Sequence, residues 1–162
     1  MGTLFLNDGW TLEYPDGFHV MDEKEREEIR FLGGVCGECL SDPERHILFS
    51  VAWKRIGGFA ALILNEKDIA KAMEFRVREP MEAYGYRPEG FSERRVGGKK
   101  ACCFRYSYEV EGVAMRGESM AFKDGKTVWY VHFYYRQAME AESGPVAEGM
   151  LASLRPAEKR DE

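Results

Sequence analysis

The stretch KACCFRYSYEVEGVAMRGESMAFKDGKTVWYVHFYYR, residues 100–136, decides the fold. From Lys100 to Val110 side chains alternate between two faces, a period of two that is typical of a β-strand. Glu111-Gly112 and Asp124-Gly125 interrupt the pattern, and Asp-Gly is a strong signal for a two-residue hairpin turn. This stretch therefore predicts three consecutive strands of an antiparallel meander.

The last of these strands, Thr127–Arg136, is bulky on both faces: Trp129, Val131, Phe133 and Tyr135 alternate with Val128, Tyr130, His132 and Tyr134. A strand with one solvated face would alternate apolar with polar residues, so two bulky faces indicate a central strand covered on both sides. Upstream, Phe91–Val96 followed by Gly97-Gly98 adds a fourth strand to the meander.

The clearest helix is predicted over Asn65–Tyr84. Its apolar residues recur at spacings of three and four: Ile69, Ala72, Met73, Val77, Met81 and Tyr84. Asn65 with Asp68 resembles a capping box, and Gly85 suits the position after a helix. Pro80 removes a backbone donor, so we expect a kink or an early end there.

The remaining elements follow from shorter patterns: strands at Trp10–Tyr14, Val35–Leu40 and His46–Trp53, a short surface helix at Asp22–Arg30, and a last helix from about Ser143 that ends before Pro156. Clustered strands joined by hairpin turns, with apolar helices, predict an α+β fold in which helices cover a mostly antiparallel sheet. We expect one domain over residues 1–156 and a charged, frayed tail over residues 157–162.

Composition excludes several classes of protein. The 162 residues are 44 % hydrophobic and 31 % charged, which excludes a disordered chain. The net charge is −5, with Lys and Arg interleaved with Asp and Glu, whereas a nucleic-acid binder shows a basic domain or stripe. The longest apolar run, Gly58–Leu64, is too short to span a bilayer. The N-terminus resembles no signal peptide and so predicts a cytoplasmic protein, although a trimmed signal peptide leaves export open.

Three phrases resemble those of PsbP-like domains in order and spacing: Trp10-Thr-Leu-Glu-Tyr-Pro-Asp-Gly-Phe18, Arg95-Val-Gly-Gly98 and Met150-Leu-Ala-Ser-Leu154. This resemblance, which spans most of residues 8–156, implies the α/β/α sandwich that PsbP-like domains share with the Ran-binding protein Mog. It also implies a bacterial relative without an assigned role, and a habit of binding rather than catalysis. The family has no motif of catalytic residues that could be transferred to this chain.

Cys36-Gly-Glu-Cys39 is the one pair of cysteines with a spacing used in redox and zinc sites. Residues three apart on a strand point to opposite faces, and no second Cys pair supplies further metal ligands. Cys102 and Cys103 are adjacent and would also point apart. We interpret the cysteines as buried small hydrophobic residues and expect no metal and no cofactor.

The meander offers one candidate binding surface, made of Arg105, Arg116, Tyr130, His132, Tyr134 and Arg136. The residues of the last strand share a face by alternation, and the Asp124-Gly125 turn is expected to place Arg116 opposite them. Arg105 belongs to this surface only if the Glu111-Gly112 turn keeps the alternation of faces in register between the two strands that it joins. Cations and hydroxyls suit a small carboxylate or the acidic end of a peptide. The alternative is that a helix covers this face and its polar groups pair with one another.

No nucleophile, base or metal set stands at a workable spacing, so the sequence favours a non-catalytic binding or protein-interaction module, with no catalytic residue. Its expected partner is another protein or a small acidic ligand. We expect it to bind neither nucleic acid nor a membrane, and homo-oligomer formation stays open. Three alternatives remain: a redox or metal-dependent protein using Cys36 and Cys39, a small-molecule-binding enzyme at the His132 face, or a structural subunit of a larger assembly.

Overall fold

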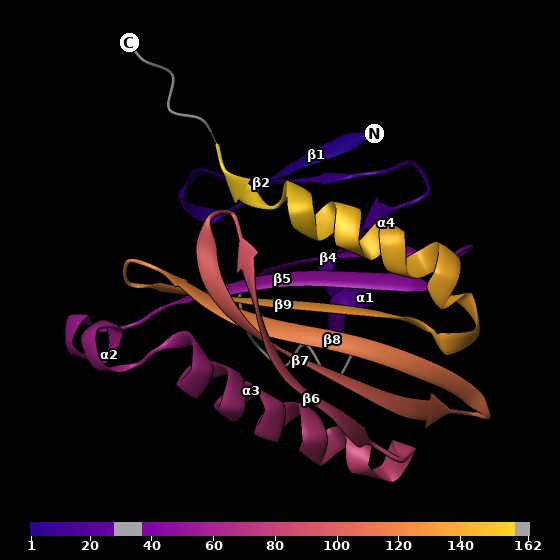
Figure 1. The fold of residues 1–162 in the computed structure, drawn as a ribbon. Helices are drawn as coiled ribbons and strands as arrows, with labels where there is room; N and C mark the ends of the chain where they lie inside the picture. The colour runs from indigo at the N-terminus through magenta and orange to yellow at the C-terminus, as the bar shows by residue number, and fades with distance from the viewer. Residues whose placement is uncertain (28–36, 158–162) are drawn as a thin grey trace.

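The computed structural model describes residues 1–27 and 37–157, and these residues are organised around a seven-stranded antiparallel sheet (Figure 1). The strand order is β3-β4-β5-β9-β8-β7-β6, so β9 lies in the middle, as its two bulky faces predict. The strands are β3 (His19–Val20), β4 (Gly37–Asp42), β5 (Ile47–Arg55), β6 (Arg87–Val96), β7 (Lys99–Val110), β8 (Val113–Asp124) and β9 (Thr127–Arg136).

Two-residue turns join the last three strands of the meander. Val110 pairs with Val113 and Asp124 pairs with Thr127, so the turns are Glu111-Gly112 and Gly125-Lys126. The second turn lies one residue beyond the predicted Asp124-Gly125. Gly125 takes the first turn position with φ +60°, a left-handed conformation that glycine adopts without strain.

One face of the sheet is covered by α3 (Glu66–Met81), which packs on β7 and β8. The capping box is present: the Asp68 backbone N–H donates to Asn65 Oδ1 at 2.9 Å, and the Asn65 N–H donates to Asp68 Oδ2 at 3.3 Å. The helix ends one residue after Pro80, and a 3₁₀ turn (Glu82–Tyr84) follows. The buried stripe faces the sheet and consists of Ile69, Ala70, Met73, Glu74, Val77 and Met81.

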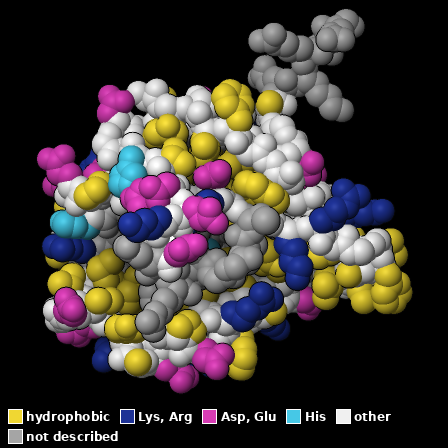
Figure 2. Space-filling view, turned by 180° about the vertical axis from the view of Figure 1, so that it is seen from behind, with side chains coloured by type: hydrophobic (Ala, Val, Ile, Leu, Met, Phe, Trp, Pro, Cys, Tyr) yellow, Lys and Arg dark blue, Asp and Glu magenta, His cyan; other side chains and the backbone are white. Residues whose placement is uncertain are grey.

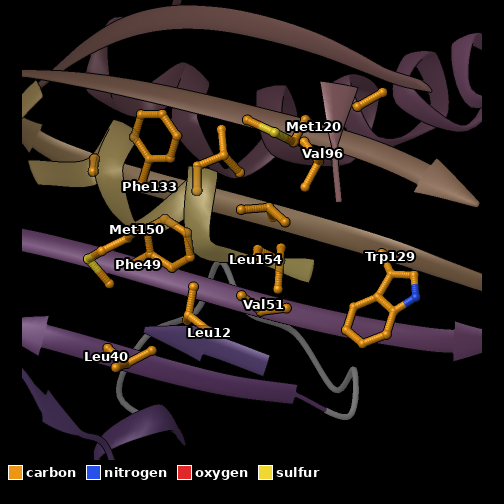
Figure 3. Packing of buried hydrophobic residues seen from close by; sticks show 14 of the residues in the cluster. Leu12, Leu40, Phe49, Val51, Val96, Met120, Trp129, Phe133, Met150 and Leu154 are labelled. Carbon is orange, nitrogen blue, oxygen red and sulfur yellow. The ribbon is translucent and has the colours of Figure 1, made fainter. Parts of the chain in front are cut away.

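The other face is covered by α4 (Glu140–Ser153) and a small sheet, β1-β2-β10, made of Gly2–Phe5, Trp10–Tyr14 and Arg155–Pro156 (Figure 1). Trp10 on β2 lies between the layers, with its ring centroid 5.0 Å from that of Trp129 and 5.3 Å from that of Phe122. Its Nε1 donates to the Asp124 carboxylate at 3.0 Å. Figure 3 shows how side chains from β2, β5, β8, β9 and α4 meet in this core.

These layers confirm the predicted α+β fold, with several local differences. The helix α4 begins at Glu140, three residues before the expected start, and β1, β3 and β10 were not predicted. The apolar run Gly58–Leu64, which is too short to span a membrane and for which no helix was predicted, contains the short helix α2 (Gly58–Ile63). Of the predicted helix at Asp22–Arg30, α1 (Glu23–Glu27) is present.

The structure does not describe residues 28–36 and 158–162, so the start of the predicted strand Val35–Leu40 and residues 158–162 of the predicted tail lie outside it. The last described residue, Ala157, donates its N–H to the Gly9 carbonyl at 2.7 Å. Within the described chain, no helix combines the length and the apolar character needed to cross a membrane.

Met73 tests this layer arrangement, because its side chain is 4 % exposed between α3 and the sheet. We expect Met73→Ala to lower the free energy of unfolding by about 2–5 kcal/mol through loss of buried contacts and cavity formation. Chemical denaturation measures this. The matched control is Phe75→Ala on the same helix, where the side chain is 66 % exposed and the change should stay below about 0.5 kcal/mol. Equal effects at both positions would contradict the arrangement.

Candidate functional site

The six predicted binding residues lie on two different faces of the large sheet. Directly paired residues of neighbouring strands point to the same face, and Arg116 pairs with Tyr135 whereas His132 pairs with Ser119. The expectation that Arg116 lies opposite His132 is therefore wrong. A two-residue turn always pairs an even-numbered residue with an odd-numbered one, so the even positions of β8 share a face with the odd positions of β9.

Arg105 and Arg116 lie on the face covered by α4, where both contact Glu140 at the start of that helix. Arg116 Nη1 donates to Glu140 Oε1 at 2.7 Å and Arg105 Nη2 donates to the same oxygen at 3.2 Å. A second nitrogen of Arg116 donates to Glu89 at 2.8 Å. The hydrogen bond from Arg116 lowers the pKa of the Glu140 carboxyl. Both guanidinium groups thus already hold carboxylates of the protein itself.

A second set of charges on the same face links α4 to the sheet further along. Arg94 on β6 donates to Glu118 of β8 at 2.9 Å and also pairs with Glu148 of α4. Burial raises the pKa of the Glu118 carboxyl, against the effect of the nearby Arg94 charge. On this face, therefore, a helix covers the sheet and the polar groups pair with one another, which is the alternative to a binding surface given in the sequence analysis.

The other predicted residues, Tyr130, His132, Tyr134 and Arg136, lie on the face covered by α3. His132 is buried, with its Nδ1 2.6 Å from Ser119 Oγ, which in turn is 2.8 Å from the Tyr106 hydroxyl. Burial lowers the pKa of His132 to about 4, so the imidazole is neutral at pH 7. Burial also raises the pKa of Tyr134 to about 12. Tyr130 and Arg136 are only partly buried.

The register places His132 in a row of potential nucleophiles that the sequence analysis did not find. Cys39 pairs with Ser50, Ser50 with His132, and His132 with Ser119, so the row crosses β4, β5, β9 and β8 on one face. None of the four is more than 9 % exposed. Burial raises the pKa of Cys39 to about 12, which keeps it a thiol. With a neutral thiol and a neutral imidazole, this row is a buried polar part of the core.

Of the cysteine pair, Cys36 lies outside the described residues. Cys39, Cys102 and Cys103 are free and buried. Cys102 belongs to the core under α3 and Cys103 to the core under α4, so the adjacent pair points to opposite faces as predicted. In residues 1–27 and 37–157, no group of three or more His, Cys, Asp or Glu side chains could hold a metal ion.

Among the described residues, the most exposed group of neighbouring apolar side chains lies on α2, at one end of the molecule (Figure 1). Phe59 is 79 % exposed, Leu62 86 % and Ile63 58 %, and none of the six helix residues is buried. Their spacing of three and four residues places them on one side of the helix. With Leu64 they form what we call the α2 surface.

The α2 surface is joined to the sheet by polar contacts and is bordered by cations. Lys123 Nζ donates to the Ala61 carbonyl at 2.7 Å, and the Ile56 N–H donates to the Lys126 carbonyl at 2.8 Å. Lys54, Arg55 and Lys126 are exposed and form no ion pair with any described residue. In Figure 2 the hydrophobic projection at the right edge lies beside Lys and Arg side chains.

No protein-family profile and no curated protein matches this sequence. Solved structures do match its fold. Cyanobacterial PsbP from Synechocystis sp. PCC 6803 superposes with a TM-score of 0.70 at 12 % identity, covering 96 % of this chain and 91 % of that one. LpqN from Mycobacterium tuberculosis, described as involved in cell envelope biogenesis, gives 0.57 at 15 % identity, with coverage of 96 % and 90 %.

A further structure, from Bacteroides thetaiotaomicron, gives a TM-score of 0.59 at 12 % identity and covers 93 % of this chain but 46 % of that one. At such identities the likeness concerns the fold alone. The fold of this protein is therefore the PsbP-like α+β fold that the sequence phrases at residues 10–18, 95–98 and 150–154 predicted.

The buried His132 predicts a pH dependence of stability. Its pKa is lowered to about 4 in the folded protein, against an ordinary 6.5 when unfolded, so the unfolded chain binds more protons between these values. Lowering the pH from 7 to 4 should therefore remove about 3 kcal/mol of stability through this group. Urea unfolding at several pH values measures the free energy of unfolding of wild type and of His132→Asn. The difference between the two isolates the contribution of His132.

The control for this measurement is His19→Asn, since His19 is exposed and pairs with Glu25. That variant should retain the steep acid destabilisation of the wild type. If His132→Asn retained it too, His132 would not be held neutral in the core.

Because the six residues lie on two faces of the sheet, we can predict which pairs of substitutions have additive effects on the free energy of unfolding. His132→Ala and Arg116→Ala share no partner, so their effects on the free energy of unfolding should sum within about 0.5 kcal/mol. Arg105→Ala and Arg116→Ala share Glu140, so their effects should depart from a simple sum. Double-mutant cycles in urea measure both. Strong coupling between His132 and Arg116 would contradict the observed register.

Proposed function

We propose that this protein is a non-catalytic binding module that contacts its partner through the α2 surface. The observation that carries the proposal is the exposure of Phe59, Leu62 and Ile63, three large apolar side chains on one side of a helix. Folded chains rarely leave contiguous apolar surface uncovered unless it is used for contact. None of the six residues of α2 is buried, so these apolar side chains add little to the core of the protein.

The contact is assigned to α2 rather than to the six residues first predicted, because of how those residues are engaged. Arg105 and Arg116 are occupied by Glu140, and His132 and Tyr134 are buried. A small acidic ligand would have to displace a carboxylate of the protein to reach Arg116, which is 18 % exposed and holds both Glu89 and Glu140. A nucleophile aligned with His132 would have to be reached through the core.

Other parts of the proposal come from the sequence. We propose that the protein is cytoplasmic, that it is related to the Mog-type proteins, and that it does not bind nucleic acid. The chain has a net charge of −5, which opposes attraction to a polyanion over the surface as a whole.

The proposal predicts how the protein sediments in an extract of its own cells. On a sucrose gradient, wild type should move with a particle much larger than its own 18.6 kDa, whereas Phe59→Asp/Leu62→Asp should stay near that mass. The control is Phe75→Asp, which places the same charge at another exposed phenylalanine and should sediment like wild type. Identical sedimentation of wild type and the α2 variant would refute α2 as the contact surface.

A further inference from the structure

Resting on the proposed function, we propose that the α2 surface docks onto an anionic lipid membrane. Two features of the described structure together point to this occupant: an apolar tip too small for a protein interface, and a border of unpaired cations. The molecule would lie on the membrane surface with α2 in the boundary between headgroups and acyl chains, and nothing would span the bilayer.

The size of the apolar tip argues for a membrane over a protein. The α2 surface offers Phe59, Leu62, Ile63 and Leu64, whereas a stable protein interface involves roughly 20–30 residues a side. A membrane requires no such area, because binding grows with the apolar surface inserted and with the attraction of nearby cations to anionic lipids. A short helix whose apolar residues all point outward is also convex, a shape suited to insertion.

The charges around α2 supply the attraction. Lys54 and Arg55 end β5 just before α2, and Lys126 lies in the adjoining hairpin turn; all three are exposed and without an ion pair among the described residues. Each cation near an anionic membrane strengthens binding by about fivefold. Two of the acids near this region are paired, since Asp124 pairs with Lys99 at 3.2 Å and Glu66 approaches Lys100 at 3.8 Å, while Asp8 accepts a hydrogen bond from Thr127 at 3.2 Å.

The same cations argue against a second copy of this chain as the occupant. Two α2 surfaces facing each other would bring the lysines and arginine of one border against those of the other, and like charges in contact oppose association. The whole chain has a net charge of −5, so attraction to an anionic surface would have to come from the cations beside α2 and would orient the protein with α2 toward the lipid.

This inference revises the sequence-based expectation of no membrane contact. That expectation rested on the length of Gly58–Leu64, which is too short to span a bilayer. A surface-bound helix needs only to place its apolar side about 5–10 Å into the interface, and a single turn of helix with large side chains reaches that depth.

The test is co-sedimentation of the full chain with vesicles of phosphatidylcholine, alone or mixed with phosphatidylglycerol. We expect binding at least about tenfold stronger to the mixed vesicles, weakening as salt is raised. Leu62→Asp and Lys54→Glu/Arg55→Glu should each reduce that binding by at least about tenfold. Phe75→Asp on α3 should leave it unchanged. Because all four substituted positions are exposed, thermal unfolding should confirm that every variant is folded.

The outcomes separate this inference from the proposed function. Equal, weak binding to both kinds of vesicle would overturn the membrane as the occupant, even if the α2 variant still changed sedimentation in the cell extract. In that case the partner of α2 is a protein. Binding to mixed vesicles that survives Leu62→Asp, or that is lost equally in Phe75→Asp, would also overturn it, because the contact would then lie elsewhere. Loss at α2 alone supports it.

Discussion

The pairing of β9 with β5 on one side and β8 on the other is the constraint on which the rest of the structure depends. It brings residues 47–55 and 113–136, far apart in the chain, into the centre of one sheet. Each residue of β9 then faces one of the two layers that cover the sheet. Trp129, Val131 and Phe133 pack under α4, while Val128 and Tyr134 belong to the core under α3. Both helical layers depend on this strand.

The short turns carry that constraint outward through the meander. With two residues at Glu111-Gly112 and two at Gly125-Lys126, the face of every residue from β7 to β9 is determined by the face of any one of them. Arg105 and Arg116 therefore had to meet the helix that covers the odd positions of β9. Their pairing with Glu140 at the start of α4 ties that helix to the edge half of the sheet.

Much of this fold could be predicted because its signals are local. Alternation identified β7 and β9, Asn65 with Asp68 identified the start of α3, and two bulky faces identified the central strand. The candidate site could not be predicted in the same way, because the face reached by a side chain depends on strand pairing. Counting residues through the predicted turn Asp124-Gly125 would have placed Arg116 opposite Phe133, on the same face as its observed partner Tyr135 and away from His132. The Cys39-to-Ser119 row, by contrast, requires the pairing of β5 with β9. The exposure of α2 could not be predicted either, because no local sequence pattern shows that the rest of the chain leaves this helix uncovered.

The position of β9 also has a consequence for how the chain folds during synthesis. Until residues 127–136 have been made, β5 has β4 as its partner on one side and an open edge on the other. That open edge carries Phe49 and Val51, and an unpaired strand of this kind is a template for pairing with another chain. The order of the strands thus places the greatest risk of aggregation in the interval between translation of β5 and translation of β9, when α3, β6, β7 and β8 are being added.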